Sequence, residues 1–215
     1  KLGFDYRLDG NSGRGLMFDM NNPPQAGSAQ TLRPRSYRDI PAMQALSMFV
    51  EDNSTLRLGT TSLQFAAGVR ISNLFLNKDK AKQGSIFVAE PRANLEYTFL
   101  TKKNNSLFDK LAISGGFGIS NKLPTLLYLY PDNAYFDSNS LSYQGGTGAN
   151  SALAIMTTKV ISDTQNAGLR PARSTKWEIG LNARTGKMKG YITYFSERHR
   201  HELGFDSRLA WLNYN

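Results

Sequence analysis

Hydrophobic and polar residues alternate along most of this chain with a period of two. The segment 174–196 is the clearest case, since Trp177 and Ile179 share one parity and Glu178 has the other. Side chains of a β-strand point alternately to its two faces. Gly186 divides the segment, and glycine readily adopts the positive φ that a tight hairpin turn requires. The pattern therefore predicts a β-hairpin with one apolar and one polar face.

The same alternation recurs along the chain and predicts about seven strands, most of them about ten residues long, which suits a tilted strand crossing a bilayer. Prolines and glycines interrupt the pattern between 10 and 42. Pro91 lies inside one run, where we expect a bulge or a local loss of pairing because proline has no N–H to donate. The predicted strands cover residues 1–9, 46–58, 63–71, 87–99, 111–119, 175–184 and 188–197.

The connections between these strands alternate in length. In an up-and-down antiparallel sheet, every second connection lies at the same end. Long loops at one end and short turns at the other are typical of an outer-membrane β-barrel, whose apolar face meets lipid and whose polar face lines the lumen. The long connections are 10–42, 73–84 and 121–173, and the shorter ones are 59–62, 101–110 and 185–187.

Two sets of side chains are expected on opposite faces of such a barrel. Charges of both signs should face a wet or plugged interior, and aromatic rings on the outer face should form girdles at the membrane boundaries. The expected inner charges are Arg70, Glu90, Arg92, Glu96, Glu178 and Arg184. The girdle candidates are Phe4, Tyr6, Tyr97, Phe99, Trp177 and Tyr194.

Composition narrows the classes of function. The chain has no cysteine, which excludes a disulfide framework and a cysteine-based zinc site. Its formal net charge is +9, but the basic residues are interspersed with acids, which argues against nucleic-acid binding. No apolar run is long enough for a membrane-spanning helix. The chain begins at Lys1 without an initiator Met or a secretory signal, so we expect a piece of a larger protein.

No catalytic constellation is readable from the sequence. The glycine-rich run 114–118 lacks the lysine of a phosphate-binding loop, and its glycines are better explained as small residues in a crowded barrel wall. His199 and His201 share a face and are a potential metal pair, but their arginine neighbours oppose cation binding. We therefore expect no enzymatic activity, no cofactor and no metal site.

The connection 121–173 holds the strongest candidate for a ligand site. Aromatic rings stack on sugars or peptides, and neighbouring carboxylates and amides form hydrogen bonds with them. An alternative stays open, in which Leu126, Leu127, Leu129 and Tyr130 pack the loop onto itself or onto a partner protein. The candidate ligand-binding residues are Tyr128, Tyr130, Asp132, Asn133, Tyr135, Phe136 and Asp137.

Short motifs occur along nearly the whole chain in an order that resembles one family. The segment 34–42 (PRSYRDIPA) is followed by the acidic pair 51–52 and then by the Gly-x-Arg of 68–70. The segments 118–125 (GISNKLPT) and 169–181, with its LRPA and WEIG, come later. In this order the motifs resemble TonB-dependent outer-membrane receptors of Bacteroidetes type, with a general similarity to the SusC-like branch.

The resemblance implies an all-β fold, an antiparallel up-and-down transmembrane β-barrel of about 22 strands with an N-terminal plug in the bacterial outer membrane. It implies TonB-dependent import of a bulky nutrient such as a glycan, peptide or chelate. An open sheet of about seven strands would leave unpaired edges in lipid. We therefore expect residues 1–215 to be part of one barrel domain whose plug and remaining strands lie outside this sequence.

The partners that the resemblance implies follow from this placement. They are outer-membrane lipid and lipopolysaccharide, the remainder of the barrel and its plug, TonB through the missing N-terminal part, and a surface lipoprotein of SusD type.

Two other architectures stay open at this stage. A soluble or surface-displayed β-sandwich, acting as a carbohydrate-binding module, would bury the apolar face against a second sheet. A small closed outer-membrane barrel of about eight strands would use Leu203, Phe205, Leu209 and Trp211 in its last strand.

Overall fold

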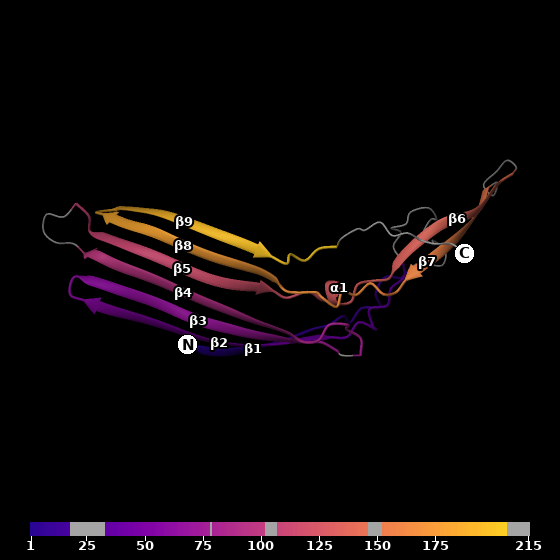
Figure 1. Ribbon diagram of the computed structural model, residues 1–215, viewed down its shortest axis with the longest axis horizontal. Helices are drawn as coiled ribbons and strands as arrows, with labels where there is room; N and C mark the ends of the chain where they lie inside the picture. Colours follow the sequence, from indigo (N-terminus) through magenta and orange to yellow (C-terminus); the bar gives the residue numbers. More distant parts are fainter. Residues whose placement is uncertain (18–32, 78, 102–106, 146–151, 206–215) are drawn as a thin grey trace.

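The structure is a computed structural model, and it describes residues 1–17, 33–77, 79–101, 107–145 and 152–205. Antiparallel strands dominate these ranges, and seven of them form one sheet in which each strand pairs with its neighbour in Figure 1. In order across the sheet they are β1 (Leu2–Asp9), β2 (Met43–Leu58), β3 (Thr61–Phe75), β4 (Ile86–Thr101), β5 (Lys110–Lys122), β8 (Ala172–Thr185) and β9 (Met188–Arg200).

The all-β, antiparallel prediction is confirmed, and the seven strands lie where the alternation placed them. Most strands extend beyond the predicted bounds, because pairing holds residues in the ladder even where the hydrophobic pattern fades. The start of β2 is an example, since Met43 already pairs with Asp9 of β1.

The connection between β5 and β8 contains structure that the hydrophobic pattern did not indicate. α1 (Leu126–Leu129) is a single turn of helix, and β6 (Ala134–Gln144) pairs with β7 (Ala152–Ile161) as a separate hairpin. The hairpin carries polar residues on both faces, so its alternation is weak. No helix among the described residues is both long and apolar enough to cross a membrane.

The predicted sorting of the connections is confirmed. Residues 59–60, 102–109 and 186–187 join strands at one end of the sheet, whereas 10–42, 76–85 and 123–171 join them at the other. Figure 1 shows the turns together at one end and the β6–β7 hairpin projecting beyond the opposite end. The end that carries the long connections is called the loop end below.

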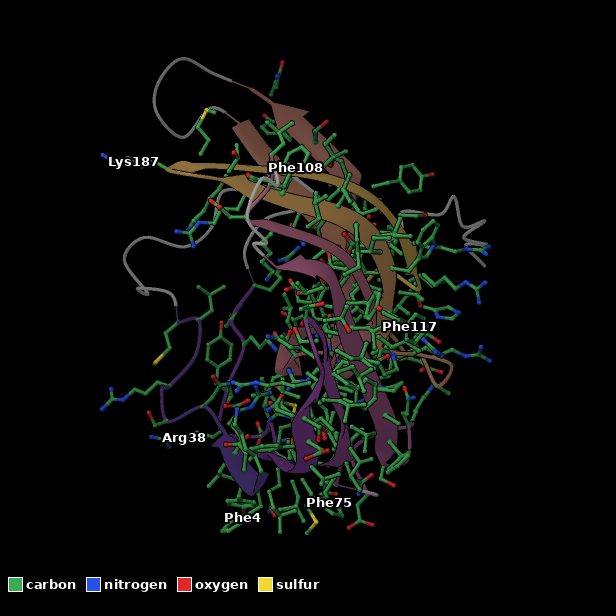
Figure 2. All side chains as sticks on the ribbon, turned by 90° about the vertical axis from the view of Figure 1, so that its left-hand side faces the viewer. Phe4, Arg38, Phe75, Phe108, Phe117 and Lys187 are labelled. Carbon is green, nitrogen blue, oxygen red and sulfur yellow. The ribbon has the colours of Figure 1, made fainter. Side chains whose placement is uncertain are left out.

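Cross-strand pairing places a row of apolar residues from each of the seven strands on one face, called the outward face below. Ile113 of β5 lies opposite Leu181 of β8, which in turn lies opposite Ile192 of β9. Figure 2 shows Phe4 and Phe117 on the same convex side of the curved sheet. The middle of this face is largely apolar, and the opposite, concave face is the inner face.

Within the part of the chain that the structure describes, no other layer covers the outward face. Ile113 and Leu181, at the centre of the wall, are 46% and 43% exposed, whereas a β-sandwich would bury them between two sheets. The second sheet of the described residues is the β6–β7 hairpin, which lies beyond the loop end rather than against this face. The sandwich alternative is therefore wrong.

The predicted girdle residues are exposed, as a position at a membrane boundary requires. The rings of Trp177 and Tyr194 lie 5.4 Å apart between centroids, and those of Tyr97 and Phe99 lie 6.5 Å apart.

Asp52 is the one carboxylate that the pairing of the described strands places on the outward face, where Ser54 donates a hydrogen bond to it at 2.8 Å.

Pro91 affects only one of its two neighbouring strands. The β3–β4 ladder passes through the Pro91–Val69 pair without a shift, so the predicted bulge is absent there. The β4–β5 ladder, by contrast, stops at Arg92. Beyond that point the backbone N–H of Asn121 donates instead to the carboxylate of Glu90 at 2.5 Å. The predicted loss of pairing is thus confirmed on the β5 side.

The edges of the sheet, β1 and β9, do not pair with each other in the described structure. Leu203 and Phe205 lie outside any strand, and Leu209 and Trp211 of the proposed eighth strand lie outside the described residues. The described chain thus forms an open wall rather than a small closed barrel.

A compact hydrophobic cluster closes the inner face at the loop end. Met43, Leu74 and Ile86 of β2, β3 and β4 are buried there against Leu129 and Tyr130. The turn of helix α1 therefore folds back over the sheet, and this contact fixes the base of the connection 123–171.

Candidate functional site

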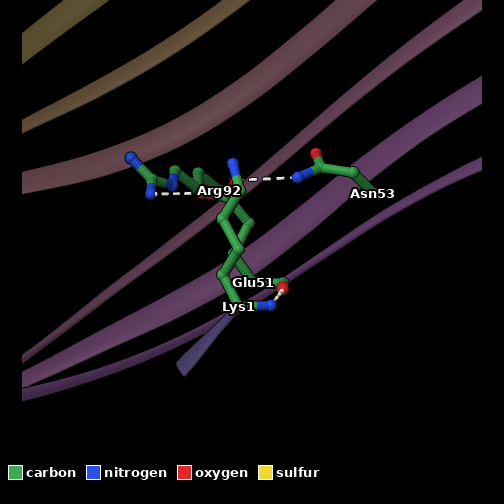
Figure 3. A network of polar contacts seen from close by, with 4 residues as sticks. All are labelled: Lys1, Glu51, Asn53 and Arg92. Carbon is green, nitrogen blue, oxygen red and sulfur yellow. Dashed lines mark hydrogen bonds and ion pairs between the residues drawn. The ribbon is translucent and has the colours of Figure 1, made fainter. Parts of the chain in front are cut away.

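The inner face is lined by paired charges. Figure 3 shows Glu51 of β2 at the centre of one network, with its carboxylate 3.2 Å from the Lys1 ammonium and 2.6 Å from the Arg92 guanidinium. Asn53 donates a further hydrogen bond to Glu51 at 3.0 Å. These contacts cross β1, β2 and β4, so they join neighbouring strands as well as neutralise the wall.

Further ion pairs continue this lining across the sheet. Lys110 lies 2.6 Å from Glu96, and Lys176 lies 3.1 Å from Glu178. Cross-strand pairing confirms that the six predicted inner charges share this face, namely Arg70, Glu90, Arg92, Glu96, Glu178 and Arg184. Three of these six residues are cations and three are anions, so the lining is polar and carries charges of both signs.

A groove of about 610 Å³ runs along the middle of the inner face. Phe49, Arg92, Asn94 and Glu178 line it. Gly116 forms part of its floor, and a Cβ there would lie 2.9 Å from the Asn94 amide oxygen and 3.0 Å from Cγ of Glu178. The interpretation of the glycines in 114–118 as small residues in a crowded wall is confirmed at Gly116, whose missing side chain makes room for two polar ones, but a Cβ on Gly115 or Gly118 would meet its nearest atom only at 3.7 or 4.0 Å.

At the loop end, two arginines connect the two longest connections. Arg33 forms an ion pair with Asp137, and its guanidinium lies 5.3 Å from the centre of the Tyr135 ring. Arg35 lies 3.8 Å from the Asp132 carboxylate. Arg35 also donates a hydrogen bond to the backbone carbonyl of Tyr130, so four of the seven candidate ligand-binding residues are in contact with one of the two arginines.

Sequence reasoning missed Arg33 and Arg35. They flank Pro34 in a segment whose prolines and glycines interrupt the strand pattern, and the motif 34–42 gave no role to Arg35. Leu16 and Arg35 exchange two backbone hydrogen bonds of 2.9 Å, and this isolated bridge holds the segment in place. The sequence did hold one signal for these contacts. Two cations lie close together in the connection 10–42, and carboxylates outnumber cations in the connection 123–171.

Tyr130 lies within the hydrophobic cluster and is 6% exposed. Burial raises the pKa of its hydroxyl, an effect that the nearby backbone of Asn77 partly offsets. Leu129 is buried beside it, whereas Leu127 is 54% exposed. At Leu129 and Tyr130 the loop therefore packs onto the protein itself, as in the alternative that the sequence left open.

Tyr128 lies apart from this arginine-linked group, whereas the backbone N–H of Asn133 donates a hydrogen bond to the Asp132 carboxylate at 2.8 Å. Tyr128 stacks on Phe205 with ring centres 5.2 Å apart and lines a separate cavity of about 320 Å³ with Lys122. Asn133 is exposed, and Phe136 lies on the hairpin face opposite to that of its neighbours in sequence. The predicted seven-residue site is therefore divided over at least two places, and ligand binding by any of its members stays a prediction.

The histidines show no metal-binding arrangement. His199 lies 3.6 Å from Glu197, and His201 is exposed just beyond β9. Within the described ranges, no three histidine or acidic side chains are grouped in a way that could hold a metal ion.

Comparison with known proteins gives one match. The family model described as "TonB dependent receptor-like, beta-barrel" matches residues 1–215. No curated protein and no solved structure matches the chain.

Proposed function

The chain belongs to the family of TonB-dependent receptors, as part of their β-barrel, and from this premise we propose that it imports a bulky nutrient such as a glycan, peptide or chelate. Members of this family are transporters of the bacterial outer membrane that interact with TonB, and they are not enzymes. The observation that carries the proposal is a single-layered wall, apolar outside and charge-lined inside, with large loops at one end.

We further propose that residues 1–215 supply only part of a larger barrel. Two unpaired edges, β1 and β9, support this, because unsatisfied backbone N–H and C=O groups in hydrocarbon are very unfavourable. The remaining strands and a plug would then come from chain outside this sequence. The order of the motifs supports assignment to the SusC-like branch of Bacteroidetes, with a SusD-type lipoprotein as partner.

For the ligand, we propose that it first contacts the connection 123–171 at the loop end. Its fixed base and the Arg33–Asp137 and Arg35–Asp132 contacts support this, since they hold a polar, aromatic surface in one place. Preorganised loops bind with less loss of conformational entropy than loops that must be ordered by the ligand.

The test is uptake by cells that carry the intact receptor. Growth would be measured on a panel of glycans, oligopeptides and iron chelates, with the receptor or TonB deleted separately. We expect one class to depend on both genes, and replacement of 134–161 by a short turn to reduce binding of that class at least about tenfold. Uptake that needs neither gene for any class would contradict the proposal.

A further inference from the structure

Three arginines lie together on the outward face, at the loop end of β8 and β9. Arg173 pairs directly with Arg200 across the two strands, and Arg198 pairs with Thr175. Arg173 has the parity of Trp177 in β8, and Arg198 and Arg200 pair with residues of that parity, so all three strand positions share the face of Trp177. A lipid-facing surface thus ends in a patch of positive charge.

The three positive charges are not neutralised by the described part of the chain. Like charges directly opposite each other destabilise a strand pair. None of the three arginines has an ion-pair or hydrogen-bond partner among the described residues, and all three are exposed. Glu197 of β9 faces inward and accepts a hydrogen bond from Ser174 at 2.5 Å, and Glu202, which lines a cavity with Arg173 and Arg200 just beyond β9, forms no ion pair with either in the described structure. An external anion would remove this repulsion.

The patch lies at the height of lipid headgroups. Trp177 and Tyr194 form an aromatic pair, and such rings prefer the membrane–water boundary. Arg173 is four residues beyond Trp177, which is about 13 Å along a strand and about 10 Å along the membrane normal at a tilt of about 40°. Below Trp177 the outward residues of β8 are Ile179 and Leu181, which are exposed and apolar. The arginines therefore lie just above an acyl-chain surface.

We propose that Arg173, Arg198 and Arg200 bind the phosphate groups of a phosphorylated glycolipid, the lipopolysaccharide of the outer leaflet. Guanidinium groups bind phosphate with two parallel hydrogen bonds, and the apolar wall beneath accommodates the acyl chains. Long loops mark the external side of such barrels, which places the patch in the outer leaflet. Apart from Asp52, these are the only charged residues that the pairing of the described sheet places on the outward face, so the site is local.

The experiment uses the intact receptor in phosphatidylcholine nanodiscs that contain diphosphorylated lipid A at a fixed fraction. Lipid retained by the receptor is counted by native mass spectrometry. The triple variant Arg173→Gln, Arg198→Gln, Arg200→Gln is expected to retain lipid A at least about tenfold more weakly, because each cation adds to attraction toward an anionic headgroup. The wild-type receptor should retain dephosphorylated lipid A only weakly. This retention should equal that of diphosphorylated lipid A by the triple variant.

The matched control is Lys176→Gln, Arg184→Gln, Lys189→Gln, which removes the same charge from the inner face of the same strands and should leave retention unchanged. Millimolar inorganic phosphate should not displace the lipid, which separates a lipid site from a free-phosphate site. If the triple variant fails to fold, Arg200→Gln alone should weaken retention about threefold. Equal retention by variant and wild type, as would follow if carboxylates of an adjoining strand neutralise the patch, would overturn the proposal.

Discussion

At the scale of single residues, two strands of the wall approach each other closely at a glycine. A Cβ on Gly68 of β3 would lie 2.8 Å from the backbone oxygen of Val50, and backbone atoms of a paired strand cannot move aside as a flexible side chain can. Gly118 of β5 is also on the inner face, but a Cβ there would meet Cβ of Arg92 only at 4.0 Å. The Gly-x-Arg segment therefore needs glycine for a physical reason.

We predict that Gly68→Ala destabilises the barrel by about 1–3 kcal/mol, the usual effect of forcing extra atoms into a packed site. Gly118→Ala is the matched control and should change stability by about 0.5 kcal/mol or less. The measurement is the temperature at which the intact receptor loses its heat-modifiable gel migration. Equal shifts for the two variants would contradict the close approach at Gly68.

At the scale of elements, the inserted turn α1 has a positioning role. Its residue Leu129 is buried against the inner face, whereas Leu127, in the same turn, is exposed. The strands of the wall are held by their ladders, whereas the base of the connection 123–171 packs on this small cluster. Loss of the cluster should therefore release the base of the loop and leave the wall folded.

We predict that Leu129→Ala destabilises the base of the loop by about 2–5 kcal/mol, because it leaves a cavity among buried apolar residues. Limited proteolysis of intact cells should then cut the loop faster, while heat-modifiable migration of the wall stays unchanged. Leu127→Ala is the control, with little effect on either measurement. Loss of the folded wall in Leu129→Ala alone would show that the cluster holds the sheet rather than the loop.

At the scale of the whole molecule, alternation was sufficient to predict the wall and insufficient to predict the loops. The period of two predicts where the strands lie, which side chains share a face, and at which end each connection lies. It does so because one apolar face strongly constrains the register of the strands. The β6–β7 hairpin and the arginine contacts depend on pairing between polar segments distant in sequence, such as Arg33 with Asp137, which no local pattern reveals. The burial of Tyr130 likewise depends on a fold-back that only the tertiary structure shows.

We predict that Ile192→Arg destabilises the receptor by about 2–4 kcal/mol if its site lies near the bilayer midplane, whereas Thr193→Arg changes its stability little. The two residues are neighbours in β9, and both are exposed, but they lie on opposite faces. The measurement is denaturant unfolding in lipid vesicles. In detergent-free water a soluble sheet would tolerate both arginines equally, so equal effects in vesicles would refute a lipid-facing wall.

The sorting of the connections also constrains how such a wall is assembled. A chain delivered from inside the cell must carry its bulky polar segments, including the hairpin of β6 and β7, across the hydrocarbon to reach the outside. A sheet that had already closed in lipid would offer these segments no route. The large segments therefore have to cross the membrane before the barrel closes. Translocation of the longest of them, 123–171, should be the rate-limiting step of assembly.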